Sequence, residues 1–334
     1  MKKFLFTLFR FSKVAIITLM LLILSYIYFD PFKVLRSYND YYDSQVVLNR
    51  DYVSTEVFIR NYKIYNYNSF IFGSSRTLAF RPNSWKKYLD STARPFMFDA
   101  SSESIYGIYT KIRFLDSLDI KMKNVLIILC RDASFAHTEN HNGHLFIKDP
   151  KVSNESKIVF QNDFFKAYLN PGFLLNFYSY KITGKYKKSM ASYIMEKKIN
   201  QDKISNKMEL FNQEIEIDKD ARGYYLNRKD LFYLRGEERV DSVKRIKNQH
   251  LKMLQAIKTI LVKRKVNYRI VLSPLYEQIK FNEKDLSLLK EIFKNHIYDY
   301  SGKNHFTDEM QNYYENSHYR PLVGDSILAN IYKK

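Results

Sequence analysis

Two short stretches of the chain carry residue types that together can do nucleophilic chemistry. The first, residues 70–77, reads Phe-Ile-Phe-Gly-Ser-Ser-Arg-Thr. An apolar strand ending in glycine and two serines would expose a hydroxyl at the carboxyl edge of a parallel sheet, where α/β folds place reactive groups. The backbone N–H of such a serine, near a helix N-terminus, can also help to bind the oxyanion of acyl transfer. A simple helix cap after a strand is the plain alternative.

The second stretch lies near the C-terminus, where residues 314–321 read Tyr-Glu-Asn-Ser-His-Tyr-Arg-Pro, followed by Gly324 and Asp325. His318 has a carboxylate, Glu315, three residues before it. In a turn or a single helical turn, Glu315 can accept a hydrogen bond from Nδ1 of His318 and fix its tautomer, which a general base requires. Taken alone, His318 fits an ordinary surface or capping histidine equally well.

Together the two stretches resemble the SGNH (GDSL-like) hydrolase superfamily, in which a strand-end Gly-x-Ser opens the domain and Asp-x-x-His near its end supplies acid and base. The form found here looks like the membrane-anchored branch related to alginate O-acetylation and teichoic-acid D-alanylation proteins. By this resemblance Ser75 is the nucleophile, Ser74 replaces the Asp of the GDS form, His318 is the base and Glu315 the acid. Glu315 is a departure, because the family has Asp there.

The resemblance also implies an oxyanion hole, for which the candidates are the N–H of Ser75, the block around Ser102 and Gly107, and Arg131. The family's asparagine after the third strand is absent: residues 129–135 read Leu-Cys-Arg-Asp-Ala-Ser-Phe. Arg131 is the candidate replacement donor. Asp132 is expected either to cap the end of the strand or to support a residue of the site, because an ionised carboxylate cannot donate a hydrogen bond to an oxyanion.

The expected function is that of a membrane-anchored, extracytoplasmic O-acyltransferase or esterase acting on a cell-envelope or exported polysaccharide. Transfer and hydrolysis use the same residues and differ only in what attacks the acyl-enzyme. By resemblance, a membrane acyl-donor exporter is a further partner; no cofactor or metal is expected. The alternative is a non-catalytic SGNH-like protein that binds glycan or organises envelope assembly, which the missing asparagine and Glu315 favour.

The elements that must position these residues form an alternating pattern. Five short apolar runs are typical of buried strands: residues 69–72, 95–98, 125–129, 268–272 and 296–300. Helical periodicity is clearest over residues 238–263 and 283–294, each leading into a strand. This alternation predicts an α/β fold with a parallel sheet between helices, which in SGNH-like proteins is flavodoxin-like. Residues 149–236 lack this alternation of strands and helices and are expected to form a largely helical insertion.

The N-terminus predicts a membrane anchor. Residues 14–29 are almost wholly apolar, and Lys2, Lys3, Arg10 and Lys13 precede them. The positive-inside bias predicts a cytoplasmic tail (1–13), a single spanning helix (14–29), a juxtamembrane stalk (30–61) and an exported domain (62–334) facing the periplasm or exterior. A cleaved signal peptide is the rival, but residues 25–28 are too bulky for a cleavage site.

The charge and the remaining reactive residues restrict the partners. The formal charge is +19. A basic surface favours anionic lipid or acidic polymers as partners, and export makes nucleic acid the least expected one. A Lys-rich surface that is simply solvated is an equal alternative. Lys181, Lys185, Lys187 and Lys188 fit contact with lipid head groups or an anionic glycan, and a plain solvated face fits them equally well. The single cysteine, Cys130, excludes an internal disulfide and is expected to be buried. His137, His141 and His144 are expected in an exposed loop and not at a metal.

Overall fold

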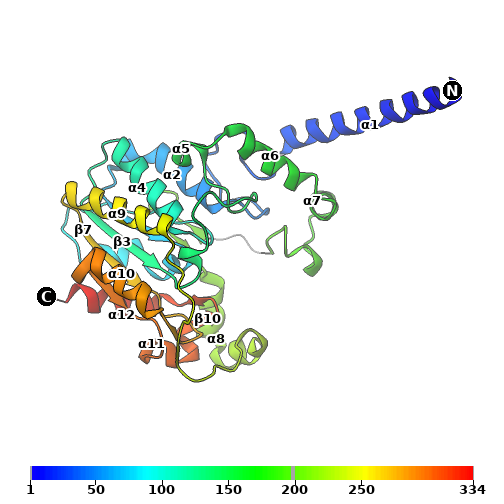
Figure 1. Ribbon diagram of the computed structural model, residues 1–334. Coiled ribbons are helices and arrows are strands. Elements are labelled where there is room, and N and C mark those ends of the chain that lie inside the picture. Colours follow the sequence, from blue (N-terminus) through cyan, green and yellow to red (C-terminus); the bar gives the residue numbers. More distant parts are fainter. Residues whose placement is uncertain (1, 197–199, 334) are drawn as a thin grey trace. The chain divides into compact units, whose positions relative to one another are not determined.

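The computed structural model describes residues 2–196 and 200–333; positions 1, 197–199 and 334, which fall in the expected tail, insertion and C-terminus, lie outside the described residues. The chain divides into two compact units (Figure 1). The first unit comprises residues 2–48, 143–145 and 156–196, and the second comprises residues 49–142, 146–155 and 200–333.

The first unit contains the long N-terminal helix α1 (Lys2–Phe29), the helices α6 (Lys157–Tyr168) and α7 (Pro171–Thr183), and the short turn η3 (Lys188–Met190). Residues 3–29 of α1 are long and apolar enough to cross a membrane, which fits both a membrane anchor and a signal sequence. The most apolar stretch of the helix is not buried by protein, whereas Tyr26 near its end is buried. Both α6 and α7 begin at side-chain caps. Ser156 accepts a hydrogen bond from the backbone N–H of Val159, and Asn170 accepts one from that of Phe173.

The second unit is built on a five-stranded parallel sheet. Its strands are β1 (Ser69–Gly73), β2 (Pro95–Met97), β3 (Asn124–Leu129), β7 (Asn267–Leu272) and β9 (Ile297–Asp299). They lie side by side in the order β2-β1-β3-β7-β9, and every neighbouring pair is parallel. The α/β class and all five predicted strands are therefore confirmed, with no strand end shifted by more than one residue. Counted along the chain, the order is 2-1-3-4-5, whose direction of winding reverses between β1 and β3.

Helices cover the sheet on both faces, so its central strands are continuous apolar runs. α4 (Ile105–Ser117) packs against α9 (Asn248–Lys263), which in turn contacts α10 (Glu283–Phe293), and α3 (Pro82–Lys86) packs against α12 (Pro321–Tyr332). Trp85 of α3 and Val323 and Ile327 of α12 share a buried cluster with Ile71 and Ile128 of the strands. The alternation of strand side chains thus supplies a core beneath the α3 and α12 layer.

The remaining elements of the second unit are short or peripheral. The helices are α2 (Arg50–Tyr65), α5 (Pro150–Ser153), α8 (Phe211–Leu226, kinked at Asp220) and α11 (His305–Asp308). The short strands are β4 (Asn200–Gln201), β5 (Met208–Glu209), β6 (Arg239–Val240), β8 (Ile279–Lys280), β10 (Tyr313–Glu315) and β11 (His318–Tyr319). The 3-10 turns are η1 (Ser75–Ala79), η2 (Ala133–Phe135), η4 (Lys229–Leu231), η5 (Lys294–His296) and η6 (Met310–Asn312).

The helix predicted over residues 238–263 begins ten residues later than expected. Carboxylates hold the preceding segment in a non-helical path: Asp285 accepts from the backbone N–H groups of Arg245 and Ile246, and Asp241 accepts from that of Val243. The segment expected as a stalk also contains α2, whose Arg50–Phe58 side chains are buried in the second unit. Helices do fill much of the expected insertion, but its residues 156–196 belong to the unit of α1.

Candidate functional site

Ser75 begins η1, directly beyond the carboxyl end of β1. Gly73, the last residue of β1, has a φ of +148°, and a Cβ there would lie 2.6 Å from the carbonyl oxygen of Ile128 in β3. Only glycine fits this close approach and this backbone conformation. The chain then turns, and the Thr77 hydroxyl and N–H both bond the carbonyl of Ser74 at 2.9 Å. Ser75 is therefore presented where the winding of the sheet reverses.

Ser75, His318 and Glu315 form a hydrogen-bonded relay. Oγ of Ser75 lies 2.8 Å from Nε2 of His318, although the two residues are 243 positions apart. Nδ1 of His318 bonds Oε1 of Glu315, whose other oxygen accepts from the N–H of Ser317 at 2.6 Å. Burial opposes the charge of Glu315, but the bonding and charge of His318 outweigh it and hold the pKa of that carboxyl below its usual value. The histidine side chain is 28% exposed, so a substrate can reach it.

A two-residue hairpin sets the geometry of the histidine and its carboxylate. Glu315 ends β10 and His318 begins β11, and the two residues pair directly across the antiparallel ladder. Paired residues on one face of such a ladder have side chains within contact distance. Tyr313 and Tyr319 fix the hairpin to the sheet, since the Tyr313 hydroxyl donates to the carbonyl of Pro274 at 3.0 Å and that of Tyr319 lies 3.3 Å from Oγ of Ser273.

Gly324, which closes the C-terminal motif, brings α12 against η1. A Cβ at Gly324 would lie 2.0 Å from the carbonyl oxygen of Ala79, the last residue of η1. Arg81 and Asp325 form an ion pair beside this contact. The glycine therefore permits the close packing that holds the serine turn beside the histidine hairpin.

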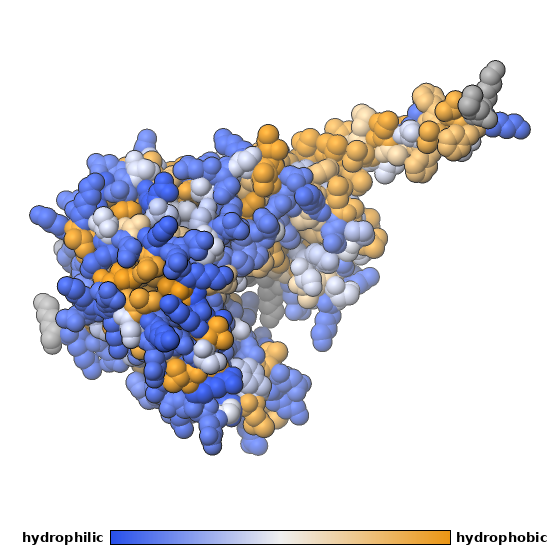
Figure 2. Space-filling model, in the orientation of Figure 1, coloured by the Kyte–Doolittle hydropathy of each residue, from blue (hydrophilic) through white to orange (hydrophobic). Residues whose placement is uncertain are grey.

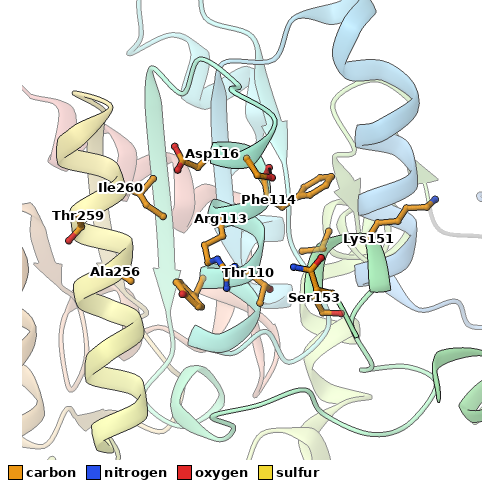
Figure 3. Close-up of a pocket in the computed structure, with 13 residues that line it drawn as sticks. Thr110, Arg113, Phe114, Asp116, Lys151, Ser153, Ala256, Thr259 and Ile260 are labelled. Atoms are coloured by element: carbon orange, nitrogen blue, oxygen red, sulfur yellow. Dashed lines mark hydrogen bonds between the residues drawn. The ribbon is translucent and has the colours of Figure 1, made fainter. Parts of the chain in front are cut away.

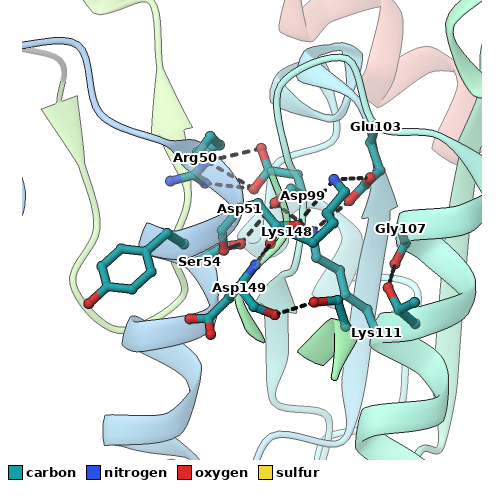
Figure 4. Close-up of polar contacts among 12 residues, drawn as sticks. Arg50, Asp51, Ser54, Asp99, Glu103, Gly107, Lys111, Lys148 and Asp149 are labelled. Atoms are coloured by element: carbon teal, nitrogen blue, oxygen red, sulfur yellow. Dashed lines mark hydrogen bonds and ion pairs between the residues drawn. The ribbon is translucent and has the colours of Figure 1, made fainter. Parts of the chain in front are cut away.

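A buried charge network supports the loop after β2, which runs beside the serine turn. Ala100 donates its N–H to the carbonyl of Gly73 at 3.2 Å, and Asp99 pairs with Arg50 of α2 at 2.8 Å (Figure 4). Further along, Glu103 accepts from Lys111 at 2.6 Å and from Lys148 at 2.5 Å.

Asp51 completes the network by pairing with the same two lysines. Although burial works against its charge, Lys111 and Lys148 lower the pKa of Asp51 to about 2. The network therefore holds charged groups inside the protein by compensating each of them.

The two oxyanion candidates in this loop have different surroundings. Ser102 is exposed and has a left-handed φ of +48° in the loop beyond β2. Gly107 is buried in the first turn of α4, where a Cβ would collide with Glu103 and Lys148 (Figure 4). Its small size is required by the charge network, which gives Gly107 a packing role.

Arg131 follows β3 and is held by two carboxylates. It pairs with Asp241 and, at 2.7 Å, with Glu277, and its Nε also donates to Glu277. These pairs join the loop after β3 to Asp241, which follows β6, and to Glu277 in the loop after β7, so Nε, Nη1 and Nη2 already have protein acceptors. Asp132 accepts from the N–H of Ala133 at 2.7 Å, which confirms the expected strand-end cap. Cys130 is buried as predicted, 3.5 Å from Oγ of Ser74.

Arg76 is a residue of this site that the sequence alone did not single out. It directly follows Ser75, and its Nε is buried without a hydrogen-bond partner among the residues that the structure describes. Nearby Cys130 raises the pKa of the guanidinium, with further contributions from Asp132 and Glu315 that offset the cost of burial. The available signal was the basic residue within Gly-Ser-Ser-Arg, next to the nucleophile.

A hollow in the second unit is lined by other residues. It has a volume of about 690 Å³ and is lined by α4, α5 and α9, with Arg113, Lys151 and Thr259 among its walls (Figure 3). None of the Ser75, His318 and Glu315 side chains lines it. Within residues 2–196 and 200–333, no group of three or more His, Cys, Asp or Glu side chains is arranged to hold a metal ion.

No protein-family model matches the chain, and no curated protein matches it significantly.

Proposed function

We propose that the chain is a membrane-anchored, SGNH-like serine enzyme that transfers or removes an O-acyl group on a cell-envelope or exported polysaccharide. The observation that carries this proposal is the Ser75–His318–Glu315 relay, assembled from two motifs at opposite ends of the second unit. The strand order 2-1-3-4-5, with Ser75 at the reversal point, supports a site at that edge. The resemblance of the two motifs to the SGNH superfamily gives the acyl chemistry.

The relay supports a two-step reaction. His318 Nε2 takes the proton of Ser75 as Oγ attacks the carbonyl carbon of an acyl donor, and Glu315 stabilises the imidazolium that forms. Collapse of the tetrahedral intermediate expels the donor's alcohol, which recovers the proton from His318. A sugar hydroxyl or water then gives its proton to His318 and attacks the acyl-serine, and the proton returns to Oγ of Ser75.

Labelling with a fluorophosphonate probe tests the proposal, because the probe bonds to an activated serine. The full-length protein should label, and Ser75→Ala should not. The matched control is Ser74→Ala, which removes the adjacent, buried hydroxyl 3.5 Å from Cys130 and should still label. If the wild-type protein does not label, the result would contradict the proposed enzymatic activity and favour the non-catalytic, glycan-binding role.

Acyl-group analysis of envelope glycans in a deletion strain would distinguish the two reactions. A transferase predicts loss of one ester from the glycan, whereas an esterase predicts its accumulation. A Ser75→Ala strain should reproduce the deletion in either case, because both reactions pass through the acyl-serine.

A further inference from the structure

The helices α6 and α7 form an aromatic hairpin (residues 157–183) that packs on the end of α1. Tyr26 contacts Phe165 and Tyr168, with ring centroids 5.3 and 5.1 Å apart. One turn later, Phe29 packs on Phe177 with ring centroids 5.7 Å apart. The hairpin therefore contacts the last turn of α1.

Polar contacts lie at the same level of the helix. The hydroxyls of Ser25 and Tyr178 are hydrogen-bonded, and Tyr178 lies 2.8 Å from the hydroxyl of Tyr168. By contrast, the side chains of Phe4, Val14 and Met20 on the preceding turns of α1 are exposed. At about 1.5 Å per residue, Ser25 to Phe29 spans about 6 Å, the depth to which interfacial helices enter a leaflet.

One face of α7 carries large apolar side chains that are exposed. In α7, Phe173 and Phe177 are buried, whereas Leu175 and Ile182 are 74% and 83% exposed. Leu175 and Ile182 are seven residues apart and so lie on the same face of the helix. Figure 2 shows apolar residues along α1 and continuing onto the neighbouring part of the same unit. Leaving this face in water would be unfavourable.

The charge of the segment is almost entirely positive. Residues 156–190 contain six lysines and one acid, Asp163. Lys185, Lys187 and Lys188 follow the C-terminus of α7 and are exposed, and Nζ of Lys181 lies 5.6 Å from the ring centroids of Phe29 and Phe177. Aromatic and aliphatic side chains flanked by lysines are typical of elements that lie at a membrane surface.

We infer that the α6–α7 hairpin is a second membrane-contacting element, seated in the leaflet where α1 ends, with Leu175 and Ile182 among the acyl chains and the lysines on anionic head groups. The inference does not depend on the chemistry of Ser75. It gives the first unit two contacts with one leaflet, a spanning helix and an interfacial hairpin. A lone helix would allow the first unit to tilt relative to the membrane, whereas the hairpin restricts that tilt.

Environment-sensitive labels on single cysteines test this placement. Leu175→Cys and Ile182→Cys are each labelled with a nitrobenzoxadiazole dye in the full-length protein, reconstituted in phosphatidylcholine vesicles with or without phosphatidylglycerol. Wild type provides the background, because its Cys130 is buried. Leu234→Cys is the matched control, since that leucine is 100% exposed in the second unit.

Labels at positions 175 and 182 should show blue-shifted emission and quenching by lipids carrying a nitroxide near the head group, while the label at 234 should report water. Replacing Lys185, Lys187 and Lys188 by glutamine should abolish any additional shift caused by phosphatidylglycerol. Water-like emission at both hairpin positions would overturn the inference. Protection of these positions in native membranes but not in vesicles would also overturn it, in favour of a protein partner.

Discussion

At the scale of single residues, the role of Glu315 can be separated from that of Ser75. Glu315→Gln removes the charge that stabilises protonated His318 and allows the wrong tautomer of the ring. The rate of fluorophosphonate labelling should fall by about 10²- to 10⁴-fold, as expected for the orienting acid of a triad. The rate is measured as label incorporated against time.

Glu315→Asp is the matched control for this change. It restores the charge on a side chain that is one methylene shorter, and it should recover much of the labelling rate. Aspartate is also the residue at this position in the SGNH pattern that the site resembles. Equal rates for wild type and Glu315→Gln would show that the carboxylate does not assist His318.

Arg76 should contribute to the reaction as a cation beside the nucleophile. Its buried Nε has no hydrogen-bond partner in the described part of the chain, so a negative charge that develops next to Ser75 has a nearby guanidinium to stabilise it. Arg76→Met should lower kcat on p-nitrophenyl acetate by on the order of 10²-fold with a smaller change in KM, and Arg76→Lys should retain part of kcat. A change confined to KM would instead assign Arg76 to substrate binding.

The three residues of the relay, Ser75, His318 and Glu315, could be selected from sequence because each belongs to a local motif. Ser75 ends a recognisable strand, and three positions fix Glu315 relative to His318. Arg131 and Gly107 differ, because their environments come from distant residues. Asp241 and Glu277 occupy the donors of Arg131, and Lys148 closes over Gly107, none of which local spacing reveals.

At the scale of elements, the buried charge network should be important for the stability of the second unit. Lys111→Met leaves Glu103 and Asp51 with one fewer cation in a site without solvent. The free energy of unfolding should fall by about 3–5 kcal/mol, as it does when one partner of a buried pair is removed. Urea unfolding of the full chain in detergent can be followed by the single tryptophan, Trp85, which is fully buried in this unit.

Asp119→Asn is the control for Lys111→Met, because it removes an ion pair with Arg264 in which the aspartate is 86% exposed. A surface pair of this kind contributes at most about 1 kcal/mol. Similar losses in the free energy of unfolding for the two variants would contradict the larger stabilising contribution expected of the buried network.

Asp149 should make the stability of the protein decrease as the pH rises. Burial, with the nearby carboxylates of Glu56 and Asp51, raises the pKa of Asp149 to about 7. The folded state binds this proton more tightly than the unfolded state does. Asp149 therefore begins to lower the free energy of unfolding above pH 4, and the loss grows until about pH 7.

Asp149→Asn keeps an oxygen to accept from the N–H of Lys151 and cannot ionise. It should stabilise the protein at pH 8 by about 1–4 kcal/mol, since each pKa unit corresponds to about 1.4 kcal/mol, and should change little at pH 4. Urea unfolding of both proteins at the two pH values, followed by Trp85, measures this difference. If Asp149→Asn is no more stable than wild type at pH 8, the ionised Asp149 side chain does not destabilise the folded protein.

The strands and helices of the sheet were predictable because burial on both faces leaves a continuous apolar run, and amphipathic periodicity marks α9 and α10. Residues 238–247 were misassigned as helix because they continue that periodicity. Their conformation depends on Asp285, about forty residues away, which occupies two backbone N–H groups that a helix would use. Tertiary bonds of this kind override local pattern.

At the scale of the whole molecule, the division into two units was not predictable from composition. Residues 156–196 read as one insertion together with the segment that follows, yet they cluster with α1. Contacts such as those of Tyr26 with Phe165 and Tyr168 join positions about 140 apart. Aromatic residues pack with many partners, so sequence shows that they will be buried without showing against what.

The orientation of the chain across the membrane decides whether the proposed substrate is reachable. Four basic residues precede the apolar run of α1 and none lies within residues 14–29, so the N-terminus should remain in the cytoplasm and Ser75 should lie outside. Single cysteines report this directly. Leu234→Cys should react with a membrane-impermeant maleimide in intact cells, whereas Phe4→Cys should react only after permeabilisation.

Wild type controls both measurements, because buried Cys130 should not react before denaturation. The reverse pattern would place Ser75, His318 and Glu315 in the cytoplasm, where no exported polysaccharide is present. It would exclude the proposed substrate but would not contradict the hydrogen-bonded relay. Loss of position 4 from the mature protein would instead identify α1 as a cleaved signal sequence. In that case the hairpin would lose the helix on which it packs, and its apolar face could not be held at a leaflet by α1.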